Sequence, residues 1–192
     1  MATTPILSPG GGGVAGTTVT RILTFAALTG SALMGGVFFA YGNSVLGSLE
    51  RMPAGQGAAA MNMVNVEIYN PLFMLIFMGT CLVCLVLAVL GLVRGGPGRW
   101  WSLTGSALYL AGVIITIAVN VPWSDRLAAV GPATPEGAAE WSRFLSHWNP
   151  ANDLRAVACT LAVIAFGLAL TRADGPRGGS PATRPAFMGN RW

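Results

Sequence analysis

Three stretches of the chain contain side chains that could exchange protons or bind a polar ligand. They span residues 62–70, 120–126 and 147–155 and are rich in Asn, Asp, Glu, Arg, His and Trp. An imidazole can act as a general base near neutral pH, while guanidinium and amide groups can donate hydrogen bonds to a negatively charged oxygen. Polar side chains are costly near membrane depth, so if the fold brings these stretches to one end of a bundle they predict a pocket with a polar floor.

The polar residues of these stretches form two groups of candidates. The candidates for catalysis are His147, Arg155, Asn152, Asp125 and Glu67. The candidates for substrate binding are Asn62, Asn65, Tyr69, Asn120, Trp123, Trp148 and Asn149. Each residue type also has a purely structural role, because Asn caps helices, Asp and Arg form solvated pairs in loops, and Arg can reach the lipid headgroups from a helix end.

Neither a metal site nor a cofactor site is predicted. The chain has one histidine, and its three cysteines, Cys81, Cys84 and Cys159, lie inside apolar segments. Metal-binding carboxylate bundles use repeated Glu and Glu-x-x-His motifs, and these residues do not follow that pattern. The glycine run at 10–13 is not expected to follow a strand, so it is not a nucleotide-binding motif. We therefore expect no metal and no cofactor.

The elements that must position these residues are membrane helices. Apolar residues make up 53% of the 192 residues and charged residues only 9%, against about 25% charged residues in a typical globular chain. Four apolar segments, at about 22–46, 69–93, 101–121 and 154–170, can cross a lipid bilayer. We predict an all-α, integral membrane four-helix bundle. The arginines are scattered, so the charge pattern does not favour a nucleic acid partner.

The connection between the third and fourth segments predicts a short amphipathic helix at the membrane interface. Its apolar face follows the i, i+3, i+4, i+7 spacing and consists of Trp141, Phe144, Leu145 and Trp148. Tryptophan is common at the level of the lipid headgroups. Asn149 and Pro150 then predict the N-cap and first residue of the fourth membrane helix.

Arginine placement predicts the topology. The four-helix domain is expected over 21–171, between a disordered leader at 1–20 and a disordered Arg-, Gly- and Pro-rich tail at 172–192. With four spans, seven of the eleven arginines fall on the side of the termini and four on the opposite side. Basic residues are enriched on the cytoplasmic side. We therefore expect a multi-pass cell-membrane protein with both termini in the cytoplasm.

The first apolar segment carries a stripe of small residues. Ala32, Gly36 and Ala40 follow one another at intervals of four residues, a spacing that lets helix backbones approach closely in lipid. The stripe could serve packing inside the bundle or the formation of a homo-oligomer, and the sequence leaves both alternatives open.

The polar stretches resemble the anthrone-oxygenase-like family of four-helix membrane proteins. The resemblance covers about residues 22–170 and includes A-A-A-M-N-M-V-N at 58–65; its specific elements are N-V-P-W-S-D-R-L at 120–127 and W-N-P-A-N-D-L-R at 148–155. Ser124 and Asn62 stand where members often have Asn and Gln. Bacterial members mostly carry a domain of unknown function, whereas fungal members are implicated in oxidising anthrones to anthraquinones.

The resemblance implies oxidation of a flat aromatic molecule by O₂ without a cofactor. Removal of a proton from the methylene group of an anthrone gives an electron-rich enolate that can react with O₂ directly. Three side chains could remove the proton: His147, or alternatively Glu67 or Asp125. Three could stabilise the enolate oxygen: Arg155, Asn152 and Asn65. Two could stack on the aromatic rings: Trp148 and Trp123.

The sequence also allows a non-catalytic function. A small accessory membrane subunit could use the same polar end to bind a lipid headgroup, a quinone or a partner protein. The two alternatives differ in geometry, because an enzyme should bury His147, Asn152 and Arg155 between its helices and an accessory subunit should expose them. A transporter is not favoured, because no charge is expected at mid-membrane and no helix is broken there by proline.

Overall fold

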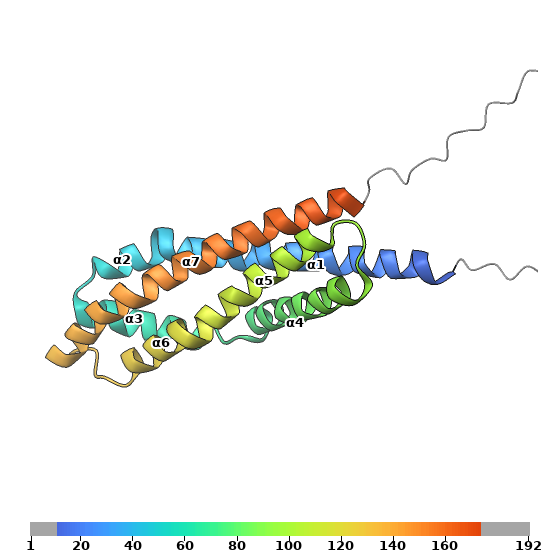
Figure 1. Ribbon diagram of the computed structural model, residues 1–192. Coiled ribbons are helices and arrows are strands. Elements are labelled where there is room, and N and C mark those ends of the chain that lie inside the picture. Colours follow the sequence, from blue (N-terminus) through green and yellow to red (C-terminus); the bar gives the residue numbers. More distant parts are fainter. Residues whose placement is uncertain (1–10, 174–192) are drawn as a thin grey trace, which may run out of the picture.

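The computed structural model describes residues 11–173, and all regular elements in this part of the chain are helices (Figure 1). The first rod consists of α1 (Gly11–Ala40), the π-helical turn η1 (Tyr41–Val45) and α2 (Leu46–Glu50). Next come α3 (Ala54–Glu67) and α4 (Pro71–Arg94). The third rod consists of α5 (Arg99–Ile115), a second π-helical turn η2 (Thr116–Asn120) and α6 (Val121–Ala128). The last helix is α7 (Pro135–Ala173).

Four helical stretches are long and apolar enough to cross a membrane, namely Gly16–Glu50, Pro71–Arg94, Arg99–Ala128 and Pro135–Arg172. In this bundle α7 packs along α1 and α5, and α4 packs against the same two helices. The prediction of an all-α, four-helix, multi-pass membrane protein is confirmed. We call the end with the start of α1, the turn at 95–98 and the end of α7 the terminal end. We call the opposite end, with α2, α3, α6 and the start of α7, the far end (Figure 1).

The separate interfacial helix predicted before the fourth span is wrong. Helix α7 runs without a break from Pro135 to Ala173, so Asn149 is not an N-cap and Pro150 lies inside the helix. A neighbouring helix supports the backbone near this proline, because the Asn120 Nδ2 donates a hydrogen bond to the Trp148 carbonyl oxygen over 3.2 Å. Such support from neighbouring helices is what makes proline tolerable within membrane helices.

The apolar face predicted for that segment exists, but it packs against protein. Trp141, Phe144 and Trp148 are buried in a cluster at the far end, which also contains Leu46, Ala58, Met61 and Leu127. Helices α2, α3 and α6 supply these neighbours, so the two tryptophan rings are covered by protein. The periodicity identified the buried face, but its partner is the rest of the bundle.

The described helices extend beyond the predicted limits of the domain. Helix α1 begins at Gly11, upstream of the expected boundary at Arg21, because the uncharged stretch 11–20 continues the apolar helix. Helix α7 ends at Ala173, just past the expected boundary at 171. The remainder of the predicted leader (1–10) and nearly all of the predicted tail (174–192) lie outside the described residues.

Helix α3 is an element that the sequence analysis did not include. It ends at Glu67, and Asn70 then starts α4, because its Oδ1 accepts a hydrogen bond from the Phe73 backbone N–H over 2.9 Å. Pro71 occupies the first helical position, where its missing N–H costs nothing. This tight connection places the end of α3 beside the start of α4, a position that matters for the site below.

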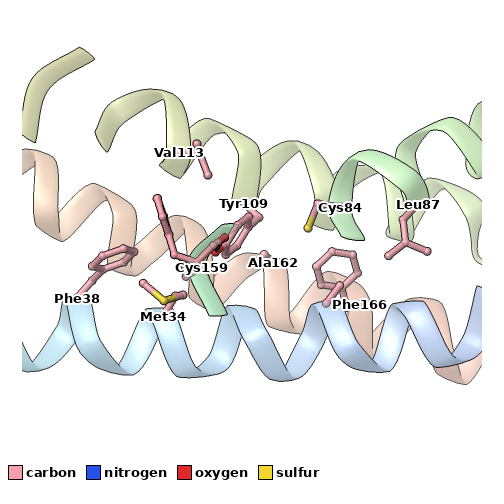
Figure 2. Close-up of a cluster of buried hydrophobic side chains, with 11 residues drawn as sticks. Met34, Phe38, Cys84, Leu87, Tyr109, Val113, Cys159, Ala162 and Phe166 are labelled. Atoms are coloured by element: carbon pink, nitrogen blue, oxygen red, sulfur yellow. Dashed lines mark hydrogen bonds between the residues drawn. The ribbon is translucent and has the colours of Figure 1, made fainter. Parts of the chain in front are cut away.

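The four spans bury a continuous apolar cluster between them. Figure 2 shows Met34 and Phe38 of α1 facing Tyr109 of α5 and Cys159 of α7, with Phe166 further along. The Tyr109 hydroxyl donates a hydrogen bond to the Phe77 carbonyl oxygen of α4 over 3.0 Å, which joins two of the helices. Cys84 and Cys159 are buried and not disulfide-bonded, so they act here as small packing side chains.

The small-residue stripe of α1 does not pack inside the bundle. Ala32, Gly36 and Ala40 are exposed, and a Cβ added at Gly36 would meet nothing within 4 Å. The close helix contact is instead made one residue earlier, where a Cβ at Gly35 would lie 3.2 Å from the Cβ of Cys159. The stripe therefore does not pack against the described part of the chain, and a homo-oligomer stays a prediction.

Candidate functional site

A pocket of about 190 Å³ opens between the spans, on the far-end side of the apolar cluster that the four spans bury. Its lining residues come from α1, η1, α3, α4, η2, α6 and α7 and are Val37, Phe38, Tyr41, Val64, Asn65, Ile68, Tyr69, Phe73, Met74, Phe77, Met78, Thr116, Ile117, Asn120, Val121, Ser124, Trp148, Asn152 and Arg155. A mostly apolar wall with a few polar groups is typical of small-molecule sites. The volume lies below the roughly 300–1,000 Å³ of pockets for drug-sized ligands, so the enclosed part suits a small or flat group.

The charged group of the pocket is Arg155, which is only 5% exposed. Its Nη2 donates to the Asn152 Oδ1 over 3.0 Å and its Nη1 to the Thr116 Oγ1 over 3.1 Å. Its guanidinium carbon lies 4.2 Å from the centre of the Phe38 ring. No carboxylate in the described part of the chain lies within 4 Å of this guanidinium. A buried positive charge without a counter-ion is costly, so the site favours a ligand with a negative or electron-rich oxygen.

Two asparagines hold α7 in place around this charge. Asn152 is fully buried, and its Nδ2 donates to the Phe38 carbonyl oxygen of α1 over 2.9 Å while its Oδ1 accepts from Arg155. Asn120 of η2 is buried as well and bonds the Trp148 carbonyl oxygen. These bonds join α7 to two other spans, so they determine the position of Arg155.

Both π-helical turns border the pocket. Tyr41 starts η1, and η2 contributes Thr116, Ile117 and Asn120 to the lining. A π-helical turn widens a helix locally and is frequent at functional sites. At η1 the backbone comes so close to α7 that a Cβ at Gly42 would collide with the Asp153 side chain. A larger residue at this position would make the exposed Asp153 side chain turn away.

Three buried polar atoms of the pocket have no hydrogen-bond partner. They are the Arg155 Nε, the Asn65 Nδ2 and the Asn120 Oδ1. An unsatisfied buried polar group costs about 1–3 kcal/mol, and ligands commonly satisfy such groups. The two nitrogens are donors and the amide oxygen is an acceptor. A ligand that fits this set carries an acceptor oxygen and a hydroxyl group.

The pocket opens sideways. Helix α4 packs against α1 and α5 and, among the described elements, against no other, so it diverges from η2 and α7 at this level. The residues along the gap are exposed to the outside, with Ile117 at 65%, Tyr69 at 60% and Met78 at 43%. A ligand dissolved in the bilayer would meet this opening directly. If the ligand is larger than the enclosed volume, its remaining part could stay in the opening.

The structure brings together about half of the predicted site residues. Six line the pocket, namely Arg155, Asn152, Asn120, Asn65, Tyr69 and Trp148. Six others do not line it, namely His147, Asp125, Glu67, Asn62, Trp123 and Asn149. The second group contains all the proton acceptors that the sequence analysis put forward.

His147 lies on the outer surface of the far end. Its ring stacks on Trp123 with 4.1 Å between the ring centres, and its Nδ1 lies 2.9 Å from the Arg143 carbonyl oxygen. On the other side of Trp123, the Arg126 guanidinium lies 4.7 Å from the ring centre. His147, Asp125 and Glu67 are all exposed. His147 and Trp123 therefore form a stacked pair of rings at the surface.

Several pocket residues were missed by the sequence analysis. Phe38, Phe73 and Phe77 form its apolar wall, and Thr116 orients Arg155. The aromatic residues could not be told apart from ordinary core residues by periodicity. Thr116 offered a weak signal, because it is a polar residue within an apolar segment, although membrane-helix threonines usually bond their own backbone. Thr116 does both, since its Oγ1 also donates to the Gly112 carbonyl oxygen over 2.9 Å.

Metal-ligating side chains do not gather at this pocket. Within residues 11–173, no three His, Cys, Asp or Glu side chains lie close enough together to hold one ion. The groups available for chemistry in the pocket are therefore the guanidinium, the amides, the hydroxyls of Thr116 and Ser124, and the phenols of Tyr41 and Tyr69.

Comparison with known proteins found a match to one family model. Residues 73–165 match the model of the family described as Anthrone oxygenase. This segment contains α5, η2 and α6, most of α4 and α7, and with them Arg155, Asn152 and Asn120. Neither the curated proteins nor the solved structures gave a match to the chain. The match over residues 73–165, just under half of the 192 residues, supports an anthrone-oxygenase-like family for this four-helix membrane protein.

Proposed function

We propose that this protein is a membrane oxygenase that converts an anthrone-type aromatic molecule into the corresponding quinone with O₂. The observation that carries the proposal is the buried Arg155 guanidinium, which has no carboxylate partner among the described residues and faces an apolar pocket. The family match supports the same class of reaction. Access from the bilayer suits a flat apolar substrate.

The proposed chemistry begins with loss of one proton from the substrate methylene group. The resulting enolate places its negative charge on the carbonyl oxygen, where the Arg155 Nε and the Asn65 Nδ2 can donate hydrogen bonds. The enolate carbon then adds O₂ and one proton to give a hydroperoxide. Loss of water from the hydroperoxide forms the second carbonyl group. In sum, one anthrone and one O₂ give one anthraquinone and one water.

Each polar group of the pocket has a role in this proposal. Arg155 stabilises the enolate, and Asn152 and Thr116 hold the guanidinium in place. The unpartnered Asn120 Oδ1 accepts a hydrogen bond from a ring hydroxyl next to the carbonyl group. Trp148 and Phe38 pack against the rings. An apolar environment strengthens the attraction between the guanidinium and the enolate.

The base in this proposal is solvent at the mouth of the pocket. His147, Glu67 and Asp125 are exposed and lie outside the pocket lining, so none of them is placed to reach a bound methylene group. A positive charge next to the carbonyl oxygen favours the enolate form, which reduces the strength of base that the reaction needs. We therefore assign the catalytic effect to charge stabilisation by Arg155 and not to a protein base.

The alternative function is binding without catalysis. The observation in its favour is the same lack of His, Asp and Glu in the pocket lining. In this case the pocket would hold a hydroxylated aromatic molecule or a quinone as an accessory subunit of another enzyme. The polar groups would then recognise the ligand but not change it.

The experiment that tests the proposal measures O₂ uptake and quinone formation by the purified protein in detergent with dithranol (1,8-dihydroxyanthrone). The reference is the slow uncatalysed oxidation of dithranol in the same detergent. We expect uptake well above this blank and one quinone per O₂ consumed. Uptake equal to the blank, together with saturable dithranol binding, would reject the oxygenase and support the binding function.

We further propose that the protein lies in the cell membrane with both termini in the cytoplasm. The support is the distribution of charge in the bundle. Four arginines of the described chain, Arg21, Arg94, Arg99 and Arg172, lie at the terminal end, and basic residues are enriched on the cytoplasmic side of membrane proteins. In a variant whose three native cysteines are replaced by alanine, labelling of a single cysteine introduced at Arg51 or at the exposed Pro97, in intact and in lysed cells, tests this orientation. A Pro97→Cys variant that reacts in intact cells with an impermeant reagent would reverse it.

A further inference from the structure

A second pocket, of about 650 Å³, lies at the terminal end of the bundle. We call it the terminal pocket. It lies between the start of α1, the end of α4, the start of α5 and the end of α7, and it is separate from the site of the proposed function. Arg21, Arg94 and Arg99 line it, and no carboxylate does. We propose that the terminal pocket binds a phosphate group, as presented by the headgroup of an acidic phospholipid.

Charge is the first argument for this proposal. All six acidic residues in the described part of the chain belong to other regions; they are Glu50, Glu67, Asp125, Glu136, Glu140 and Asp153. No described carboxylate lies within 4 Å of the Arg94 or Arg99 guanidinium. Guanidinium groups bind phosphate through paired hydrogen bonds. Within the described chain, Arg94 and Arg99 therefore have no carboxylate partner, and both are available to an anion.

The geometry of the connection from α4 to α5 brings the arginines together. Gly95, Gly96 and Gly98 all have positive φ angles, of 66°, 106° and 77°, which glycine adopts without strain. Gly98 also lies so close to α7 that a Cβ would be 2.6 Å from the Ala169 carbonyl oxygen. This turn reverses the chain within a few residues, so that Arg94 and Arg99 border one cavity.

A buried hydroxyl group provides an independent observation. Ser102, in the first turns of α5, is 6% exposed and lines the terminal pocket, and its Oγ has no hydrogen-bond partner. Serine in a membrane helix normally bonds a carbonyl oxygen of the preceding turn. A free hydroxyl beside the amino end of a 17-residue helix is suited to an anion, because that end carries a partial positive charge.

The apolar part of the pocket points to a lipid as the source of the phosphate. Leu87, Leu90 and Leu170 line the same cavity as the arginines, so an acyl chain could continue from the headgroup along α4 and α7. A free phosphate ion would use the arginines and Ser102 but not these leucines. A phospholipid and a free phosphate ion would therefore use the same phosphate-binding groups, and only the phospholipid would use the leucines, for its acyl chain.

The test uses the full-length protein in a neutral detergent and measures binding by native mass spectrometry. The lipid probe is phosphatidylglycerol, with phosphatidylcholine as the lipid without net charge, and inorganic phosphate is the soluble probe. The test variant is Arg94→Gln/Arg99→Gln. The matched control is Arg51→Gln/Arg126→Gln, which removes the same charge from exposed sites of the far end.

We expect tight binding of one phosphatidylglycerol, reduced roughly tenfold or more in the Arg94→Gln/Arg99→Gln variant and unchanged in the control. Ser102→Ala should reduce binding a few-fold without loss of thermal stability, because the hydroxyl bonds nothing in the protein. Equal losses in both double variants would show general charge attraction and overturn the proposal, as would no loss in either. Arginine-dependent binding of inorganic phosphate without lipid binding would retain the phosphate site and reject the lipid.

Discussion

Arg155 and His147 lie eight positions apart on the same helix, yet their surroundings differ completely. Arg155 is buried in the pocket among Asn152, Thr116 and Phe38, whereas His147 stacks on Trp123 at the surface. The register of α7 explains the difference. Trp148, Asn152 and Arg155 follow the i, i+4, i+7 spacing of one helix face, and His147 is turned about 100° from that face.

The comparison between the pocket and the exposed far end teaches which kind of residue matters here. The far end contains the ionisable groups that chemistry usually requires, but water surrounds them. The pocket contains one charge and several amides in an apolar environment, where each interaction is stronger. Function in this protein is therefore expected to depend on a few buried hydrogen bonds.

Replacement of Arg155 by methionine should have the largest effect on activity. We expect dithranol oxidation to fall by about a hundredfold or more, which is the usual cost of removing an oxyanion donor. The melting temperature should be unchanged or higher. Burying the guanidinium charge costs several kcal/mol, and removal of this cost outweighs the loss of the hydrogen bond to Asn152. Arg155→Lys should not restore activity, because lysine lacks the planar fork of donors. Full activity of Arg155→Met would exclude the pocket as the site.

Replacement of Asn152 by leucine should have the largest effect on stability. It removes the hydrogen bond to the Phe38 carbonyl oxygen and leaves the Arg155 Nη2 without its Asn152 partner. At about 1–3 kcal/mol for each of these two buried hydrogen bonds, the loss should be roughly 2–6 kcal/mol. Titration with sodium dodecyl sulfate measures this change. Asn149→Leu is the matched control on the same helix, because no hydrogen bond of the Asn149 side chain joins helices within the described chain. Similar losses in both variants would contradict the assigned role of Asn152.

Replacement of Asn65 by leucine should weaken the site moderately without harm to the fold. The Asn65 Nδ2 is buried and unpartnered, so its removal should lower dithranol affinity up to about tenfold and leave stability equal or slightly higher. Asn62→Leu is the control one helical turn earlier, since Asn62 also has an unpartnered buried atom but does not line the pocket. Equal affinity losses would place the ligand outside this pocket. Tryptophan fluorescence during dithranol titration provides the measurement.

Replacement of His147 by glutamine should have the smallest effect. His147 is exposed and outside the pocket lining, so we expect the rate of dithranol oxidation to remain within about twofold of the unchanged protein and to keep the same pH dependence. A loss comparable to that of Arg155→Met would show that His147 acts as the base. The far end would then have to move towards the pocket during turnover.

Much of the fold could be predicted from the sequence because lipid imposes a simple rule. A chain in the bilayer must pair its backbone within helices, so four apolar segments between scattered arginines indicate four membrane helices. The same reasoning failed at Pro150, which resembles a helix start but lies inside α7. The local signal was correct for an isolated segment. In the bundle, Asn120 of η2 bonds the Trp148 carbonyl oxygen close to the proline, and the helix continues through it.

The candidate site could be predicted only in part. The motif W-N-P-A-N-D-L-R identified Asn152 and Arg155 by type and by their shared face, and the family match covers them. The membrane class and the number of spans could thus be predicted from the sequence alone, and the roles of Asn152 and Arg155 stay predictions. Tertiary structure alone decided that His147, Asp125 and Glu67 stay outside the pocket and that Phe38, Tyr41 and Thr116 belong to it. The physical reason is that helix periodicity defines faces, whereas burial depends on which helix each face meets and on where a π-helical turn opens space between them.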